Sequence, residues 1–317
     1  MLERRLFFYV DWLLIAAVLV GIGLAMIYST TYDVIGDRVG PQFTTQLAAV
    51  GLGLVAMTVC LLVDYRRLAE HSLAIFALTA LALLYVLLFG TTAGGARRWI
   101  ALGPVNVQPS EFAKISLGLV LATFFAENRR GARGWSDLAA GSLFLIVPVV
   151  LIVREPDLGT AVTLVPIFFG IAFVAGLRLK LLAVLAVLGV LAAPVAWAFA
   201  LEDYQRSRIQ TFLDPEQDAR GAGYQQIQAR ITVGSGGLTG KGFRQGTQGQ
   251  YKFLPVAHND FIFSVLAEEQ GFRGVVITLG LYLFVIVRAL DAARLARDRL
   301  GAYLVVGLVS GFTFQVI

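Results

Sequence analysis

The sequence predicts an all-α polytopic membrane protein, and three observations support this fold class. Hydrophobic residues make up 57% of the 317 residues and charged residues only 15%. The mean hydropathy of +0.75 lies well above that of soluble domains. Apolar windows of about twenty residues, the length that crosses a bilayer as a helix, recur along the whole chain.

Nine apolar windows are predicted to span the membrane as helices. The first follows basic residues, but no small-residue cleavage site comes after it, so it is interpreted as a span and not as a signal peptide. The last runs apolar to the final residue, so we expect a further span to be missing beyond it. The windows cover residues 8–28, 44–63, 72–90, 109–126, 137–153, 158–177, 181–200, 271–288 and 300–317.

The distribution of Lys and Arg predicts a cytoplasmic N-terminus, because short cytoplasmic connections are rich in these residues. With that orientation the short outer connections hold only Arg38, Arg97, Arg98 and Arg154, whereas basic residues crowd the inner ones. Residues 201–260 then form one long extracytoplasmic loop within a single membrane domain, residues 1–317. A loop of this length in a compact protein is usually functional or disordered.

Composition excludes several classes of function. The net charge of +5 arises from arginines at span ends, so it does not indicate nucleic-acid binding. Cys60, the one cysteine, lies in an apolar run, which excludes a disulfide framework and a cysteine metal site. The glycine-rich stretch of residues 234–250 fails the phosphate-binding P-loop pattern, because Ser235 and Gly242 stand where Gly and Ser or Thr are required.

The fourth span opens with QPSEFAKISLG, in which Glu111 and Lys114 lie three residues apart on one helix face. Two interpretations stay open. The two charges neutralise each other near the interface, or they mark a site, because ionisable groups within spans are costly and are usually functional.

Arg97 and Arg98 depart from the positive-inside pattern in a short outer connection. One interpretation is an interfacial hairpin anchored by Trp99. The other is an anion site, because paired guanidinium groups bind phosphate oxygens in a bidentate manner.

The outer connection REPDLGTAV is predicted to be a short turn. In this interpretation Arg154 pairs with a carboxylate, and Asp157 is the N-cap of the next helix. In the long loop, Lys241, Arg244 and Lys252 are either solvated charges or contacts to an anionic headgroup.

The stretch VAHNDFIFSVLAEEQGF places Asp260 at the end of the long loop, before an apolar helix. Asp260 is interpreted as an N-cap or as a general base whose pKa the apolar boundary raises. His258 is a candidate substrate or metal partner, although two ligands alone are weak evidence for a metal. Glu268 and Glu269 precede Gly271 and are predicted to face water where a helix ends.

Four motifs in this order resemble the SEDS family of bacterial envelope proteins, which includes RodA, FtsW and SpoVE. The motifs are GGARRWIALGPVNVQPSEFAK, EPDLGTA, SGGLTGKGF and RQGTQGQYKFLPVAHNDFIFSVLAEEQGF. The short N-terminus favours the RodA branch, which acts in elongation. The family has ten spans and a late outer motif that this sequence lacks, and Asn259 replaces a commoner threonine.

The resemblance implies a peptidoglycan glycosyltransferase of the inner membrane, which polymerises lipid II at the outer face with a class B penicillin-binding protein as partner. It implies Asp260 as general base, inversion at the donor sugar, and undecaprenyl pyrophosphate as leaving group. Arg97, Arg98, Lys114 or a divalent cation, Mg²⁺ or Mn²⁺, would stabilise that group, and Glu111 would orient Lys114. A flippase for lipid-linked precursors and a scaffold for the cell-wall complex remain as alternatives.

Overall fold

The computed structural model describes residues 2–33, 38–93, 96–102, 105–127, 134–199, 203–218, 223–247 and 259–316. The chain divides into two compact units. The first comprises Met1–Val59 and Ala200–Val285, and the second comprises Cys60–Phe199 and Ile286–Ile317. A single membrane domain over residues 1–317 stays a prediction.

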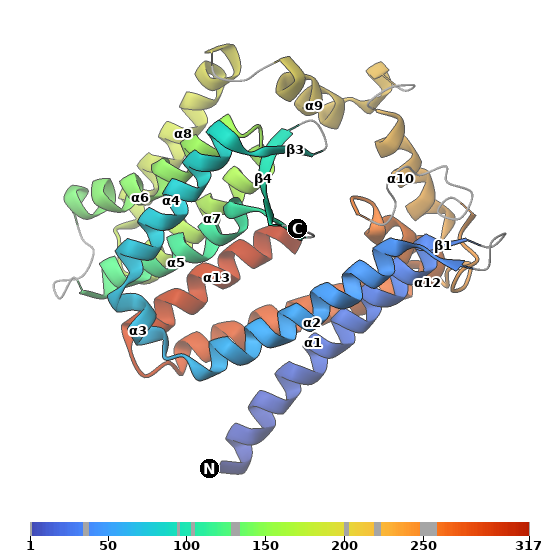
Figure 1. Cartoon of the computed structure of the whole chain (residues 1–317), viewed down its shortest axis with the longest axis horizontal. Helices are drawn as coiled ribbons and strands as arrows, with labels where there is room; N and C mark the ends of the chain where they lie inside the picture. Colours follow the sequence, from blue (N-terminus) through green and yellow to red (C-terminus); the bar gives the residue numbers. More distant parts are fainter. Residues whose placement is uncertain are drawn as a thin grey trace. The chain divides into compact units, whose positions relative to one another are not determined.

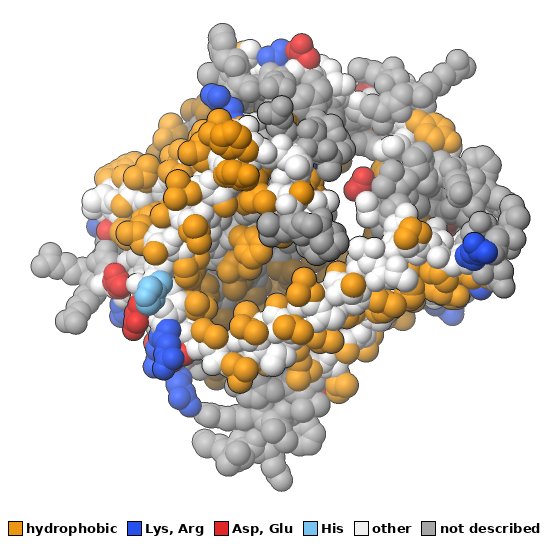
Figure 2. Space-filling view, viewed as in Figure 1, with side chains coloured by type: hydrophobic (Ala, Val, Ile, Leu, Met, Phe, Trp, Pro, Cys, Tyr) orange, Lys and Arg blue, Asp and Glu red, His pale blue; other side chains and the backbone are white. Residues whose placement is uncertain are grey.

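The described residues contain seven helices that are long and apolar enough to cross a membrane, together with two shorter apolar helices, Leu158–Val174 and Leu179–Pro194. Each of the nine predicted windows overlaps one of these helices, and the number of membrane spans stays a prediction. Large hydrophobic side chains are exposed along them, and Figure 2 shows hydrophobic side chains over the helical faces. An apolar exterior of this kind suits contact with lipid.

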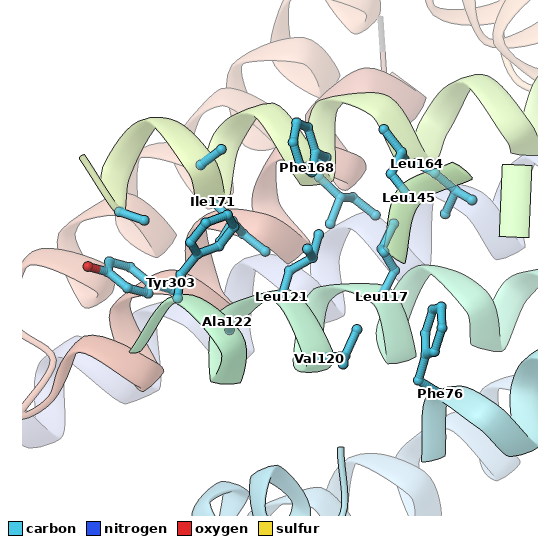
Figure 3. Packing of buried hydrophobic residues seen from close by; sticks show 14 of the residues in the cluster. Phe76, Leu117, Val120, Leu121, Ala122, Leu145, Leu164, Phe168, Ile171 and Tyr303 are labelled. Atoms are coloured by element: carbon cyan, nitrogen blue, oxygen red, sulfur yellow. The ribbon is translucent and has the colours of Figure 1, made fainter. Parts of the chain in front are cut away.

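The second unit is a helical bundle packed around α5. Its elements are α3 (Tyr65–Glu70), α4 (Ser72–Phe89), β3 (Thr91–Ala93), β4 (Ala96–Leu102), β5 (Val105–Val107), α5 (Pro109–Glu127), α6 (Trp135–Arg154), α7 (Leu158–Val174), α8 (Leu179–Phe199) and α13 (Arg299–Val316). Of the apolar window of α5, 67% is buried, because α4, α6, α7 and α13 all pack against it (Figure 1). Figure 3 shows Leu117, Leu121 and Phe168 in this core, where they are fully buried.

Small residues allow α7 and α13 to approach closely. A β-carbon added at Gly307 would lie 2.5 Å from Ile171 Cδ1, and one at Gly311 would lie 2.9 Å from Ile167 Cγ1. The two glycines form a GxxxG pattern, which is common where membrane helices pack backbone to backbone. Within a bilayer such close van der Waals packing stabilises the bundle, because lipid removes most of the hydrophobic driving force between helices.

A small antiparallel sheet, in the order β3-β4-β5, fills the connection between α4 and α5. Thr91 pairs with Trp99 and Ile100 pairs with Val107. The strands add to the predicted all-α fold and correspond to the hairpin interpretation of the Arg97–Arg98 region. They place Arg98 on the central strand.

The first unit contains three long helices, α1 and most of α2 and α12, together with the shorter helices of the long loop. Its elements are α1 (Leu2–Thr31), β1 (Tyr32–Asp33), β2 (Arg38–Val39), α2 (Pro41–Leu62), α9 (Asp203–Leu213), the 3-10 helix η1 (Pro215–Asp218), α10 (Tyr224–Ser235) and α12 (Ile262–Arg294). α1 and α12 lie side by side (Figure 1), and the Ser29 hydroxyl donates a hydrogen bond to Glu269. Helices α9, η1 and α10 in the long loop were not predicted from the sequence.

A kink divides α12 at Gly271, whose φ of 67° and ψ of −168° are not helical. The chain before α12 packs into this kink: the Phe272 N–H donates to the Gly237 carbonyl at 2.9 Å, and the Arg273 N–H donates to the Leu238 carbonyl at 3.2 Å. A φ in this region is accessible almost only to glycine. The kink therefore depends on the absence of a side chain at residue 271.

Candidate functional site

The predicted pair at the start of α5 is present. Lys114 Nζ lies 2.7 Å from Glu111 Oε2, and the exposed fraction is 13% for the Lys114 side chain and 55% for Glu111. Pro109 is the first residue of the helix, a position that tolerates proline because its N–H would be unpaired anyway. The Glu111 carboxylate thus holds the Lys114 side chain near the start of α5.

Arg98 is held by the turn between α6 and α7. Its Nε donates to the Glu155 carbonyl at 3.3 Å, one of its terminal nitrogens donates to the Pro156 carbonyl, and the other lies 3.9 Å from Asp157 Oδ1. Arg98 thus joins the central strand β4 to the α6–α7 turn. The backbone of Arg97 lies in β4, and its side chain is outside the described residues.

Asp157 is the N-cap of α7, as predicted. Its carboxylate accepts from the Thr160 N–H at 3.2 Å and from Gln108 Nε2 at 3.0 Å. The ion pair that the structure has at Asp157 is with Arg98, whereas Arg154 is exposed. Asp157 therefore links β4, the start of α5 and the start of α7.

Glu155, which the sequence analysis did not single out, is buried beside this network, with an exposed fraction of 1%. Burial, reinforced by Asp157, raises the pKa of the Glu155 carboxyl to about 8, although Arg98 acts in the opposite direction. An isolated charge in such a place is costly, so the neutral carboxylic acid is favoured near neutral pH.

Glu155→Gln is expected to reduce the pH dependence of stability. The pKa is higher in the folded chain than in the unfolded chain, so this group favours folding fully only below about pH 4, the unfolded pKa. That contribution is lost as the pH rises toward about 8. Thermal unfolding across this range should show a fall in Tm that is smaller in Glu155→Gln than in the unchanged protein or in Glu216→Gln, whose side chain is exposed. Equal falls in all three proteins would contradict the assignment.

Two of the long-loop cations that are predicted to bind an anion contact other residues of the first unit. Lys241 Nζ lies 2.6 Å from Glu268 Oε1, and the Arg244 guanidinium lies 3.6 Å from the centre of the Tyr32 ring. Whether Lys241 and Arg244 also contact substrate stays a prediction. Lys252 and His258 lie outside the described residues.

The interpretation that Glu268 and Glu269 face water is wrong, because their exposed fractions are 0% and 2%. A helical segment does end at Gly271, as predicted. Residues 236–247 of the long loop pack over this end of the helix and shield both glutamates from solvent. Two adjacent glutamates in an apolar stretch were the sequence signal for this buried site.

Asp260 is exposed and lies in the turn directly before α12, which begins at Ile262. It belongs to the first unit, whereas Arg98, Glu111, Lys114 and Asp157 belong to the second. Also in the first unit, a cavity of about 280 Å³ lies between α1 and α12 and is lined mainly by apolar side chains. Met26, Phe243 and Leu266 are among them.

No group of three or more His, Cys, Asp or Glu side chains that could hold a metal ion occurs within the described part of the chain.

Comparison with known proteins assigns the family. Residues 10–317 match the model of the FtsW/RodA/SpoVE family, described as cell cycle protein. This chain belongs to the FtsW/RodA/SpoVE family. As a member with several apolar helices, it is a multi-pass protein of the inner membrane.

Three relatives of this FtsW/RodA/SpoVE protein are informative. The peptidoglycan glycosyltransferase MrdB of Escherichia coli K12 is 38% identical over 275 residues, which cover 86% of this chain and 74% of MrdB. The crystal structure of the rod shape determining protein RodA of Thermus thermophilus matches with a TM-score of 0.68 and 28% identity, over 96% of this chain and 82% of that one. A structure of a peptidoglycan synthase complex that coordinates polymerization and crosslinking matches with a TM-score of 0.80 and 32% identity, over 96% and 84%.

Proposed function

We propose that this chain is a peptidoglycan glycosyltransferase that polymerises lipid II at the outer face of the inner membrane, for cell elongation and rod shape. The observation that carries the proposal is the match of residues 10–317 to a family with relatives such as MrdB, named a peptidoglycan glycosyltransferase. The N-terminus on the cytoplasmic side and the outer position of the long loop are part of the proposal and rest on the charge distribution.

In the proposed reaction Asp260 is the general base. Its carboxylate takes the proton from the 4-hydroxyl of the acceptor GlcNAc, while that oxygen forms a bond to the anomeric carbon of the donor MurNAc. The bond from this carbon to the pyrophosphate oxygen breaks with inversion, and undecaprenyl pyrophosphate leaves. An exposed carboxylate in a turn suits this task, because it can reach a sugar without any change in packing.

Negative charge develops on the departing pyrophosphate, so cations near it would lower the barrier. Lys114, oriented by Glu111, is proposed for this role because its side chain is only 13% exposed, and a partly buried charge is screened less than one in water. Mg²⁺ or Mn²⁺ is the alternative source of charge. The proposed binding residues are Arg97, Arg98, Lys241, Arg244 and His258.

The apolar cavity between α1 and α12 supports a lipid-linked substrate, since a prenyl chain needs an apolar surface. We further propose a class B penicillin-binding protein as partner. The similarity to the peptidoglycan synthase complex that couples polymerization to crosslinking supports a partner of this kind.

The proposal predicts that the purified chain, reconstituted in liposomes with a class B penicillin-binding protein, converts lipid II into long glycan strands. Gel analysis of labelled product measures this, and EDTA followed by added Mg²⁺ or Mn²⁺ measures the cation requirement. Movement of the labelled headgroup across the bilayer without polymer would favour the flippase alternative. No polymer and no movement, with the complex still formed, would favour a scaffold.

A further inference from the structure

The Glu268 carboxylate gathers hydrogen bonds from one short stretch of chain. Its Oε1 accepts from Lys241 Nζ at 2.6 Å, from the Thr247 N–H at 2.9 Å and from the Thr247 hydroxyl at 3.2 Å. The Ser235 hydroxyl lies 3.4 Å away. Glu268 itself is on the first part of α12, so these bonds join segment 236–247 of the long loop to that helix.

Backbone contacts fix the same segment in one register. The Lys241 N–H donates to the Glu268 carbonyl and the Gly242 N–H donates to the Glu269 carbonyl, both at 2.9 Å. The fit leaves no room for a side chain at two positions: a β-carbon at Gly240 would lie 2.2 Å from the Glu269 carbonyl oxygen, and one at Gly246 would lie 2.8 Å from Glu268 Oε2. Contacts below 3 Å require atoms to move.

Burying a carboxylate costs desolvation free energy. An apolar side chain of similar volume would pack equally well without this cost, so packing does not explain a glutamate at this position. What a carboxylate adds is direction, since charge-assisted hydrogen bonds are strong and depend on geometry. The donors from Ser235, Lys241 and Thr247 all precede α12 in the chain. The group therefore selects one position of that segment over others.

We propose that Glu268 is a positioning residue for the glycosyltransferase reaction, acting through Lys241 and Thr247. Asp260 lies in the turn before α12, eight residues before Glu268, which is about two helical turns. By fixing segment 236–247 to this part of α12, Glu268 sets where Lys241 and Arg244 lie relative to Asp260. The link to catalysis rests on the proposed function, whereas the link to loop position does not.

Hydrogen exchange tests the positional part on the purified full chain. The Lys241 and Gly242 N–H groups donate to backbone carbonyls that remain in every variant, so their exchange reports the position of the segment. In Glu268→Gln their exchange is expected to quicken about tenfold or more, because local opening becomes easier. Thr247→Val removes one hydroxyl bond to Glu268 Oε1 and keeps the Thr247 N–H bond, so it should give a smaller change in the same direction. The matched control is Asp203→Asn, an exposed carboxylate of the same loop that pairs with Arg206 at 3.4 Å.

Kinetics test the link to catalysis. Glu268→Gln is expected to lower kcat/KM for lipid II polymerisation about 10- to 100-fold, the size of effect that a shift of about 1 Å in a catalytic group produces. Gly246→Ala keeps every charged residue but presses on the Glu268 carboxylate, so it should lower kcat/KM in the same sense. If Glu268→Gln does not fold, amide exchange and kcat/KM are measured on Gly246→Ala and Thr247→Val instead.

Unchanged exchange at Lys241 and Gly242 in these variants would overturn the positioning role. Quickened exchange with unchanged kcat/KM would overturn the link to catalysis. Thermal unfolding measures the fraction of folded protein. If activity falls only in proportion to this fraction, Glu268 has a structural role and no positioning role. If the unchanged protein makes no polymer, the proposed function fails, while the exchange result still decides the loop position.

Discussion

Asp260→Asn is expected to lower the rate of lipid II polymerisation by about 10²- to 10⁴-fold, the range that a general base contributes. Asparagine has nearly the same size as aspartate but cannot take up the proton of the acceptor hydroxyl. Because Asp260 is exposed and lies in a turn, the substitution should leave the fold intact. Glycan product from reconstituted lipid II is the measurement, with thermal unfolding as the check on folding.

Two variants make this result specific. Asp214→Asn removes an exposed carboxylate from the same long loop and should leave the rate within about twofold, as is usual for surface positions. Asp260→Glu keeps a base but moves it, so an intermediate rate is expected. Near-normal polymer from a well-folded Asp260→Asn protein would remove Asp260 from the chemistry.

The membrane helices could be predicted from the sequence because their signal is local. A helix that crosses a bilayer needs about twenty consecutive apolar residues, and this requirement can be counted directly. The same criterion could not find α9 and α10, whose sequences are mixed in polarity and which contain too few residues to span. The strands β3 to β5 are short, and their pairing depends on contacts that a hydropathy window does not measure.

The site could be predicted to the extent that its contacts are local. The Glu111–Lys114 pair and the Asp157 N-cap follow from helical spacing of three residues. The contacts of Arg98 with residues 155–157 and of Lys241 with Glu268 join distant parts of the sequence, which no spacing rule specifies. The prediction that Glu268 faces solvent was wrong for this reason, because its burial depends on residues more than twenty positions earlier in the chain.

Gly271→Ala, at the kink of α12, is expected to destabilise the protein by about 3 kcal/mol or more. Two independent costs contribute. The φ of 67° is strained for any residue with a β-carbon, and that carbon would lie 2.2 Å from the Gly240 backbone nitrogen. Backbone atoms cannot rotate away as the end of a side chain can, so the segment over Glu268 would have to shift.

Gly280→Ala is the matched control, because Gly280 lies in the same helix and a β-carbon there would meet nothing within 4 Å. At this position alanine should be neutral or stabilise by up to about 1 kcal/mol, the difference in helix propensity. Thermal unfolding of both variants gives the comparison, and equal Tm values would contradict the predicted cost of a β-carbon at residue 271. If Gly271→Ala also quickens exchange at the Lys241 and Gly242 amides, while Gly280→Ala does not, then the kink and the Glu268 carboxylate act on one element. The break in α12 at Gly271 and the position of segment 236–247 would then depend on each other.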